Sequence, residues 1–209
     1  MRNLLDELLS WRKMNRQSKY EYPGTDVLIN KFDIRDNEQL RIVERTITSK
    51  RLSELELNPI RGNFDLDHLK EIHRHLFQDV YSFAGQLREE NIAKDYFSFA
   101  PAQFIGSAAN DLFRQLRQEN FLKGLSIDRF ADRAAHYMAE INVLHPFREG
   151  NGRTQREFIR QLSQHAGHNL DWSRVDPEQL LRASIRSVVD TKDLANVLRE
   201  AIQSAGPKH

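Results

Sequence analysis

Residues 145–156 constrain the fold more than any other stretch, because they must end one helix and begin the next. Apolar residues recur at helical spacing in the segment after Ser126, and again between this stretch and Gly167. His145 precedes a proline, which pushes its backbone out of the helical region. Gly150 and Gly152 can adopt conformations that are closed to most residues. We therefore expect a tight bend between two helices.

The residues of this bend favour phosphate binding. Successive N–H groups of Gly150, Asn151 and Gly152, leading into a helix N-terminus, would form a nest for an anion. Arg153 and Arg156 are three positions apart and share a helix face, where they would add bidentate phosphate donors. The stretch thus predicts a cradle for phosphate groups with two charged clamps.

Three further side chains complete the predicted site. Glu149 lies beside the nest and can hold Mg²⁺, which takes one or two carboxylates together with phosphate oxygens. His145 can accept a proton near neutral pH, and Phe147 is interpreted as the apolar anchor of the loop. Taken singly, each residue is more often structural. Their combination favours phosphoryl or nucleotidyl transfer, in which positioning and charge neutralisation dominate.

The rest of the chain predicts an all-α fold in one domain of about seven or eight helices. Helix starts are indicated at Asp36, Asp65, Ser126 and Asp176, and the last of these forms a capping box with proline at the first helical position. Pro101 is expected in the first turn of another helix. The last two helices are predicted over residues 177 to about 189 and 191–204. Residues 92–99 are aromatic or β-branched around a polar pair and predict a short β-hairpin.

The domain organisation is predicted from the same patterns. Residues 1–19 carry leucines at helical spacing and are interpreted as an N-terminal extension, residues 20–203 as the main domain and residues 204–209 as a frayed tail. No linker or internal repeat is visible.

Composition narrows the function classes. The chain of 209 residues has no cysteine, which excludes disulfides and thiolate metal sites and makes a reducing cytoplasm the expected compartment. Its 31 basic residues against 30 acidic ones argue against a dedicated nucleic-acid binder. No apolar run approaches the roughly 18 residues of a membrane span, and the N-terminus lacks a signal-peptide pattern. Secretion by a signal-free route stays open. The other histidines show no metal-ligand spacing.

Residues 145–156 match every defining position of the Fic motif, His-x-Phe-x-Asp/Glu-Gly-Asn-Gly-Arg-x-x-Arg, so the chain resembles the Fic family. Residues 83–88 resemble the family's stretch before its flap, and residues 22–25 its usual N-terminal segment; roughly residues 20–203 are covered. The resemblance implies an α-helical Fic domain with a short β-hairpin flap. It also implies transfer of AMP from ATP to a hydroxyl of a target protein.

The resemblance also assigns roles. His145 would be the base that deprotonates the target hydroxyl, and Glu149 would bind Mg²⁺. The nucleotide would contact the remaining motif residues, with the arginines on the β- and γ-phosphates: Gly150, Asn151, Gly152, Arg153, Thr154, Gln155 and Arg156. The flap, over about residues 90–100, would pair with the target by strand addition. Its candidate contacts are Phe97, Ser98 and Phe99.

One position in the motif separates two activities within the wider family. In the related Doc kinases a lysine stands where this chain has Gly152, and the γ-phosphoryl group is transferred. The glycine therefore favours adenylyl transfer.

Many Fic proteins carry an inhibitory helix with Ser/Thr-x-x-x-Glu followed by Gly or Asn, whose glutamate pairs with the second motif arginine, here Arg156. Three glutamates of this sequence precede Gly or Asn, but none has Ser or Thr four residues earlier: Glu90, Glu119 and Glu149. We therefore expect a separate small antitoxin to supply the glutamate, as for the toxin–antitoxin branch of the family.

Several functional alternatives remain. The bacterial target could be a type II topoisomerase subunit such as that of DNA gyrase, but effectors directed at host proteins share the same core. Another donor would make the chain transfer UMP, phosphocholine or phosphate. A silent interaction module is the third reading, and the intact His145, Glu149 and both arginines argue against it.

Overall fold

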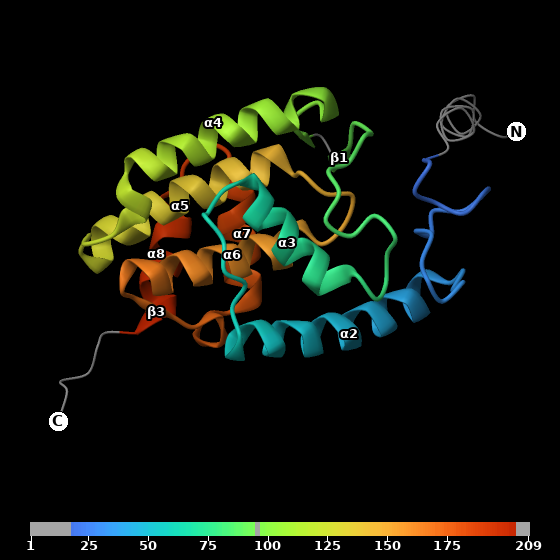
Figure 1. Ribbon diagram of the computed structural model, residues 1–209, viewed down its shortest axis with the longest axis horizontal. Helices are drawn as coiled ribbons and strands as arrows, with labels where there is room; N and C mark the ends of the chain where they lie inside the picture. The colour runs from blue at the N-terminus through green and yellow to red at the C-terminus, as the bar shows by residue number, and fades with distance from the viewer. Residues whose placement is uncertain (1–17, 95–96, 204–209) are drawn as a thin grey trace, which may run out of the picture.

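The computed structural model describes residues 18–203, apart from 95 and 96, and confirms the predicted all-α class. Figure 1 shows the seven helices of this part of the chain: α2 (Asn37–Leu57), α3 (Leu66–Phe77), α4 (Ile105–Gln118), α5 (Ile127–Leu144), α6 (Asn151–Ala166), α7 (Pro177–Arg186) and α8 (Lys192–Ala201). Short 3₁₀ turns occupy Ala102–Phe104, Asn120–Leu122 and Trp172–Arg174. The predicted helix near the N-terminus and the tail over 204–209 lie outside the described residues.

Helices α5 and α6 form the centre of the fold. Helix α6 packs against α3 and α5, and α5 packs in turn against α4 and α8. Four alanines of α5 are buried, at 131, 134, 135 and 139, and their small side chains let neighbouring helices approach closely. A helix that is apolar on most of its circumference belongs in the interior. The end of α5 and the start of α6 are therefore held on a rigid base.

Each predicted helix start carries its cap. The side chains of Asp36, Asp65 and Ser126 accept backbone N–H groups from the first turns of α2, α3 and α5. Asp176 accepts from Glu178 and Gln179 at the start of α7. The side-chain nitrogen of Gln179, the last residue of the predicted capping box, donates to Glu200.

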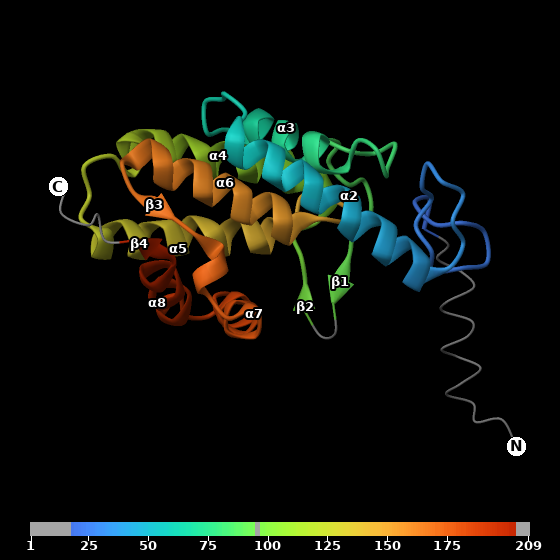
Figure 2. The same cartoon turned by 90° about the horizontal axis from the view of Figure 1, so that it is seen from below.

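The predicted hairpin is present as β1 (Ala93–Lys94) antiparallel to β2 (Phe97–Ser98). It projects from the helical body near the end of α5 (Figure 2). Pro101 was expected inside a helix, but its backbone is extended and α4 begins at Ile105. The reason is a tether to the flap: the N–H of Ala102 donates to the side-chain oxygen of Asn91 at 2.8 Å.

The predicted C-terminal helix bounds were wrong. Helix α7 ends at Arg186, before residue 189, and α8 ends at Ala201, where the prediction continued to 204. The chain then forms β4 (Ile202–Gln203), which pairs with β3 (Asn169–Leu170). Leu170 and Ile202 face each other in this register and are both buried. Burial of that pair favours an extended backbone over another helical turn.

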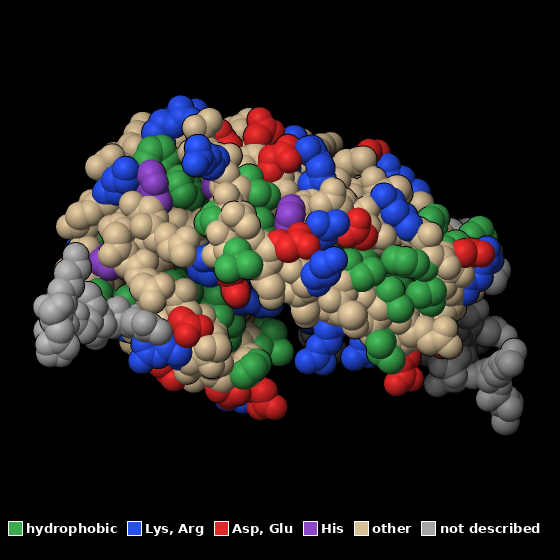
Figure 3. Space-filling view, turned by 60° about the horizontal axis from the view of Figure 1, so that its bottom comes forward, with side chains coloured by type: hydrophobic (Ala, Val, Ile, Leu, Met, Phe, Trp, Pro, Cys, Tyr) green, Lys and Arg blue, Asp and Glu red, His purple; other side chains and the backbone are tan. Residues whose placement is uncertain are grey.

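The described helices include none that has the length and apolarity to cross a bilayer. On the face drawn in Figure 3, acidic and basic side chains are interspersed, in keeping with the balanced composition.

A pair of aliphatic residues tests the packing. Ile72 in α3 is fully buried, whereas Leu57 at the end of α2 is 81% exposed. We expect Ile72→Ala to lower the free energy of unfolding by about 2–5 kcal/mol, through lost burial and a residual cavity. Leu57→Ala should change it by less than about 0.5 kcal/mol. Urea denaturation measures both, and equal losses would contradict the described position of α3.

Candidate active site

The bend between α5 and α6 uses backbone conformations that few residues tolerate. His145 ends α5 in the left-handed region with φ 44°, and Gly150 precedes α6 with φ 80°. A Cβ atom at position 150 would lie 2.2 Å from the ring of Phe77. Glycine is therefore required there both for its conformation and for close packing. The turn is shorter than expected, since Asn151 is already the first residue of α6.

The Asn151 side chain closes the loop. Its amide oxygen accepts the N–H of Phe147 at 2.9 Å, and its amide nitrogen donates to the carbonyl of the same residue at 2.8 Å. The backbone N–H groups at the start of α6 remain uncapped by any side chain. The Glu149 carboxylate accepts the N–H of Gly150, so the part of the expected nest that is open to an anion is the N–H groups of Asn151 and Gly152 at the positive helix end.

Phe147 anchors the loop as predicted, and its partner is His73 of α3. The two rings stack at 3.9 Å with an interplanar angle of 12°, and both are buried. The Nδ1 atom of His73 accepts the N–H of Gly85 at 2.8 Å, so Nε2 carries the proton and donates to the carbonyl of Glu149 at 2.9 Å. Burial lowers the pKa of His73 to about 4. The sequence showed no metal-ligand spacing at this histidine and did not indicate its partner.

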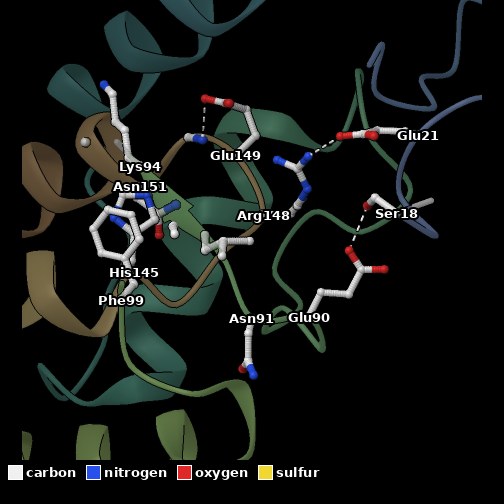
Figure 4. A pocket seen from close by; sticks show the side chains of 14 residues that line it. Ser18, Glu21, Glu90, Asn91, Lys94, Phe99, His145, Arg148, Glu149 and Asn151 are labelled. Atoms are coloured by element: carbon white, nitrogen blue, oxygen red, sulfur yellow. Dashed lines mark hydrogen bonds and ion pairs between the residues drawn. The ribbon is translucent and has the colours of Figure 1, made fainter. Parts of the chain in front are cut away.

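A pocket of about 970 Å³ opens above the bend. Its walls come from the bend, from the flap and from the segment before α2, as Figure 4 shows. Six predicted site residues line it: Phe99, His145, Glu149, Gly150, Asn151 and Gly152. The structure thus brings the predicted base, the predicted metal-binding carboxylate and the predicted phosphate nest to one cavity.

The segment before α2 is fixed to this cavity by two polar contacts that sequence reasoning missed. Glu21 forms an ion pair with Arg148 at 2.5 Å, and Ser18 donates a hydrogen bond to Glu90 at 2.7 Å (Figure 4). Since both pairs join residues far apart in the chain, no local pattern indicates them.

His145 stands in the pocket as a neutral imidazole. Burial lowers its pKa to about 4, the charges of Arg88 and Lys94 add to this, and the backbone of Asn142 opposes it. Nδ1 is buried, and we therefore infer that Nε2 is the nitrogen that acts towards the pocket. The ring of Phe99 stacks on His145 at 3.8 Å. At neutral pH the imidazole is therefore free to accept a proton.

Of the three predicted flap contacts, one lines the pocket and two do not. Phe99 lines the pocket. Phe97 and Ser98 form β2 and do not line it, although Phe97 packs edge-on against Phe99 at 5.2 Å.

Thr154 and Gln155, which the resemblance placed among the nucleotide contacts, have buried side chains that do not line the pocket. Thr154 is fully buried and donates to the carbonyl of Gly150 at 3.0 Å. The Gln155 amide donates to the carbonyl of Met138 in α5. Both side chains face inward because α6 packs that face against α5.

The two arginines have different environments. The Arg153 guanidinium forms an ion pair with Glu44 of α2 at 2.5 Å, lies 3.5 Å from Glu149 and donates to Thr48 at 3.1 Å. In the described part of the chain, the guanidinium of Arg156 has neither a hydrogen bond nor an ion pair, and burial lowers its pKa. Its Nη1 atom lies close to Gly152, because a Cβ atom added at that glycine would be 3.3 Å from it.

Three carboxylates line this pocket, and two of them already have partners: Glu21 pairs with Arg148, and Glu90 accepts from Ser18. Across residues 18–203, excluding 95 and 96, no group of three or more His, Cys, Asp or Glu residues could hold a metal ion. The Glu149 carboxylate lines the pocket and accepts the N–H of Gly150 at 2.8 Å. One carboxylate fits Mg²⁺, which completes its shell with phosphate oxygens and water.

His73 gives the fold a pH dependence. Its folded-state pKa is depressed from 6.5 to about 4, so the unfolded chain binds the proton first as pH falls. Its contribution to stability should be complete above pH 6.5 and decline towards pH 4 by about 1.4 kcal/mol per pH unit. We expect His73→Gln to be less stable at pH 7 but to lose stability less steeply between pH 6.5 and 4, measured by urea unfolding. An unchanged slope would contradict this role.

The comparisons with known proteins agree with the motif. Residues 63–163 match the model of the Fic/DOC family. Protein adenylyltransferase VbhT of Bartonella schoenbuchensis is 46% identical over 179 residues, which is 86% of this chain and only 37% of that relative. A probable protein adenylyltransferase Fic of Escherichia coli is 39% identical over 189 residues, covering 90% of this chain and 93% of the relative.

The fold has a similar match among solved structures. The crystal structure of BepC, a VirB-translocated effector of Bartonella tribocorum with bound AMPPNP, superposes with a TM-score of 0.84 and 28% identity. It covers 90% of this chain and 97% of its own. The predicted family and enzyme class are confirmed: the chain belongs to the Fic/DOC family and is a protein adenylyltransferase.

Proposed function

We propose that this enzyme transfers AMP from ATP to a hydroxyl side chain of a target protein. One observation carries the proposal: the neutral imidazole of His145 lines the same pocket as Glu149 and the uncapped N-terminus of α6. The similar BepC domain binds AMPPNP, an ATP analogue, which supports an adenine nucleotide as donor. A UMP, phosphocholine or phosphate donor remains an outcome of the test below.

The chemistry follows from the positions of these groups. Nε2 of His145 accepts the hydroxyl proton as the hydroxyl oxygen bonds to the α-phosphorus of ATP. The bond from the α-phosphorus to its bridging oxygen breaks, and pyrophosphate leaves. The N–H groups of Asn151 and Gly152 stabilise the charge that develops on the α-phosphate oxygens. Glu149 would hold Mg²⁺, which supplies positive charge to the phosphate oxygens when bound.

We assign the two motif arginines different roles. Arg156 is proposed to bind the terminal phosphates, because its guanidinium has no other partner in the described structure. Arg153 was expected to bind phosphate as well. Its contacts with Glu44 and Thr48 support a second role, which is to fix the start of α6 to α2.

The control of the enzyme is also a proposal. We propose that a small antitoxin supplies a glutamate that pairs with Arg156 and thereby excludes the terminal phosphate. The unpartnered guanidinium supports this.

The target would then be a protein of the bacterial cytoplasm, and a type II topoisomerase subunit such as that of DNA gyrase is our candidate. An effector directed at host proteins is the alternative, and BepC, whose name marks it as translocated, supports it.

His145→Ala tests the base. We expect transfer of label from α-³²P-ATP to proteins of a bacterial lysate to fall by about 10²–10⁴-fold. AMPPNP affinity should be nearly unchanged, because the nest and Arg156 are intact. Parallel reactions with γ-³²P-ATP, α-³²P-UTP and labelled CDP-choline distinguish the other donors. A variant that labels as well as the wild type would rule out His145 as the base.

Arg156→Ala tests the phosphate clamp and its control. The wild-type chain alone should be active with ATP and Mg²⁺, whereas Arg156→Ala should raise the KM for ATP by about 10–100-fold, as expected for a lost charged hydrogen bond. Arg182→Ala on α7, whose side chain is 66% exposed, is the matched control. A wild-type chain that is fully inactive by itself would count against a separate inhibitor.

A further inference from the structure

Arg88 has one of the largest fully buried side chains among the described residues, at 2% exposure. Among the described residues it has no carboxylate partner, and every hydrogen bond of its guanidinium goes to a backbone carbonyl. Nε donates to His145 at 2.8 Å, Nη1 to Glu90 at 2.7 Å, and Nη2 to Ala100 at 2.5 Å and Leu144 at 3.2 Å.

Burying a guanidinium without a carboxylate is costly, so its acceptors must compensate. Two of them, the carbonyls of Leu144 and His145, are at the C-terminal end of α5. Those carbonyls have no partner within the helix and carry the negative end of the helix dipole. The backbone N–H of Arg88 binds the next carbonyl, that of Pro146, at 2.9 Å. Arg88 therefore caps the end of α5 at the point where the base is held.

The other two acceptors connect this cap to the flap. The chain enters the flap at Glu90 and leaves it at Ala100, and one guanidinium binds both carbonyls. Only a planar group with several divergent donors can reach all four carbonyls at once. Two further contacts also connect the flap to the end of α5: the N–H of Ala100 donates to the carbonyl of Val143 at 3.1 Å, and Phe99 stacks on His145.

We propose that Arg88 is a positioning residue for AMP transfer, which fixes the flap at a set distance from His145. The proposal rests on the function proposed above, in which the flap presents the target and His145 removes its proton. A displacement of about 1 Å between two such groups can cost about a hundredfold in rate.

The positive charge of Arg88 also affects the pKa of His145. Together with Lys94 it disfavours the protonated form of His145, in addition to burial, while the backbone of Asn142 acts in the opposite direction. Removing the charge should therefore raise the pKa of His145. A residue that served the fold alone would not be expected to move both the flap and the titration of the base.

Three variants of the full chain separate these roles. Arg88→Met removes charge and hydrogen bonds, and Arg88→Lys keeps the charge but cannot reach four carbonyls. Arg160→Met is the matched control, because Arg160 is also buried and binds a carbonyl, that of Leu55, far from the flap.

The readouts are amide hydrogen exchange of residues 92–94 and 97–99, and an NMR titration of the His145 ring. The signal of that ring is identified by its absence in His145→Ala.

We expect exchange in the flap to be about tenfold faster or more in both Arg88 variants, because hydrogen bonds to a charged group are lost. The His145 pKa should rise in Arg88→Met and stay near the wild-type value in Arg88→Lys. Arg160→Met should lower thermal stability and leave both readouts unchanged. The proposal would be overturned if a folded Arg88→Met variant exchanged its flap amides at the wild-type rate. If Arg88→Met does not fold, the same result in Arg88→Lys would overturn it.

Activity is measured in parallel as label transfer from α-³²P-ATP to a bacterial lysate. Arg88→Met should reduce it by about a hundredfold, with AMPPNP affinity close to that of the wild type. If the wild type itself labels nothing, the proposed function fails, while exchange and titration still decide the role of Arg88. Full transfer activity in Arg88→Met would also overturn the proposal.

Discussion

His73 joins three parts of the molecule through the two nitrogens of one buried ring. It belongs to α3, accepts a hydrogen bond from Gly85 before the flap and donates one to the Glu149 carbonyl in the bend. The ring also stacks on Phe147, the apolar anchor of the same loop. This arrangement needs a neutral imidazole, because a proton on Nδ1 would oppose the N–H of Gly85. Burial keeps the ring in that form and so fixes the carboxylate and the phosphate nest relative to the helical core.

Of the two arginines near the start of α6, one has a carboxylate partner in the described structure and the other has none. Arg153 is neutralised by Glu44, whose second oxygen accepts the hydroxyl of Tyr81, so this arginine is part of the contact with α2. Arg156 is half-buried, is repelled by Arg153 and has no anion beside it in the described structure. A desolvated cation without a partner is costly. An anionic ligand that reached Arg156 would therefore relieve an existing electrostatic penalty in addition to adding hydrogen bonds.

The parts of this site that are built from residues close together in the chain could be predicted from the sequence. The bend, the helices on either side of it, the anchor Phe147 and the gathering of His145 with Glu149 follow from residues close together in the chain. The residues that hold the site in place could not be found in this way. His73, Arg88 and Glu44 contact the bend or α6 across 76, 57 and 109 positions, and each contact depends on how helices pack. The motif did not indicate that the side chains of Thr154 and Gln155 are buried, because a motif records positions required for packing together with positions required for chemistry.

The side chain of Asn151 has a further consequence for the lifetime of the protein. An asparagine followed by glycine is prone to deamidation, because the unshielded nitrogen of the glycine can attack the side-chain carbon and close a succinimide ring. Here both side-chain atoms of Asn151 are hydrogen-bonded to Phe147, and the following peptide is held in a helix. The geometry that closes the loop thus also protects the chain against this form of chemical ageing. An aspartate formed there would lose the donor to the Phe147 carbonyl and would place a negative charge in the phosphate nest.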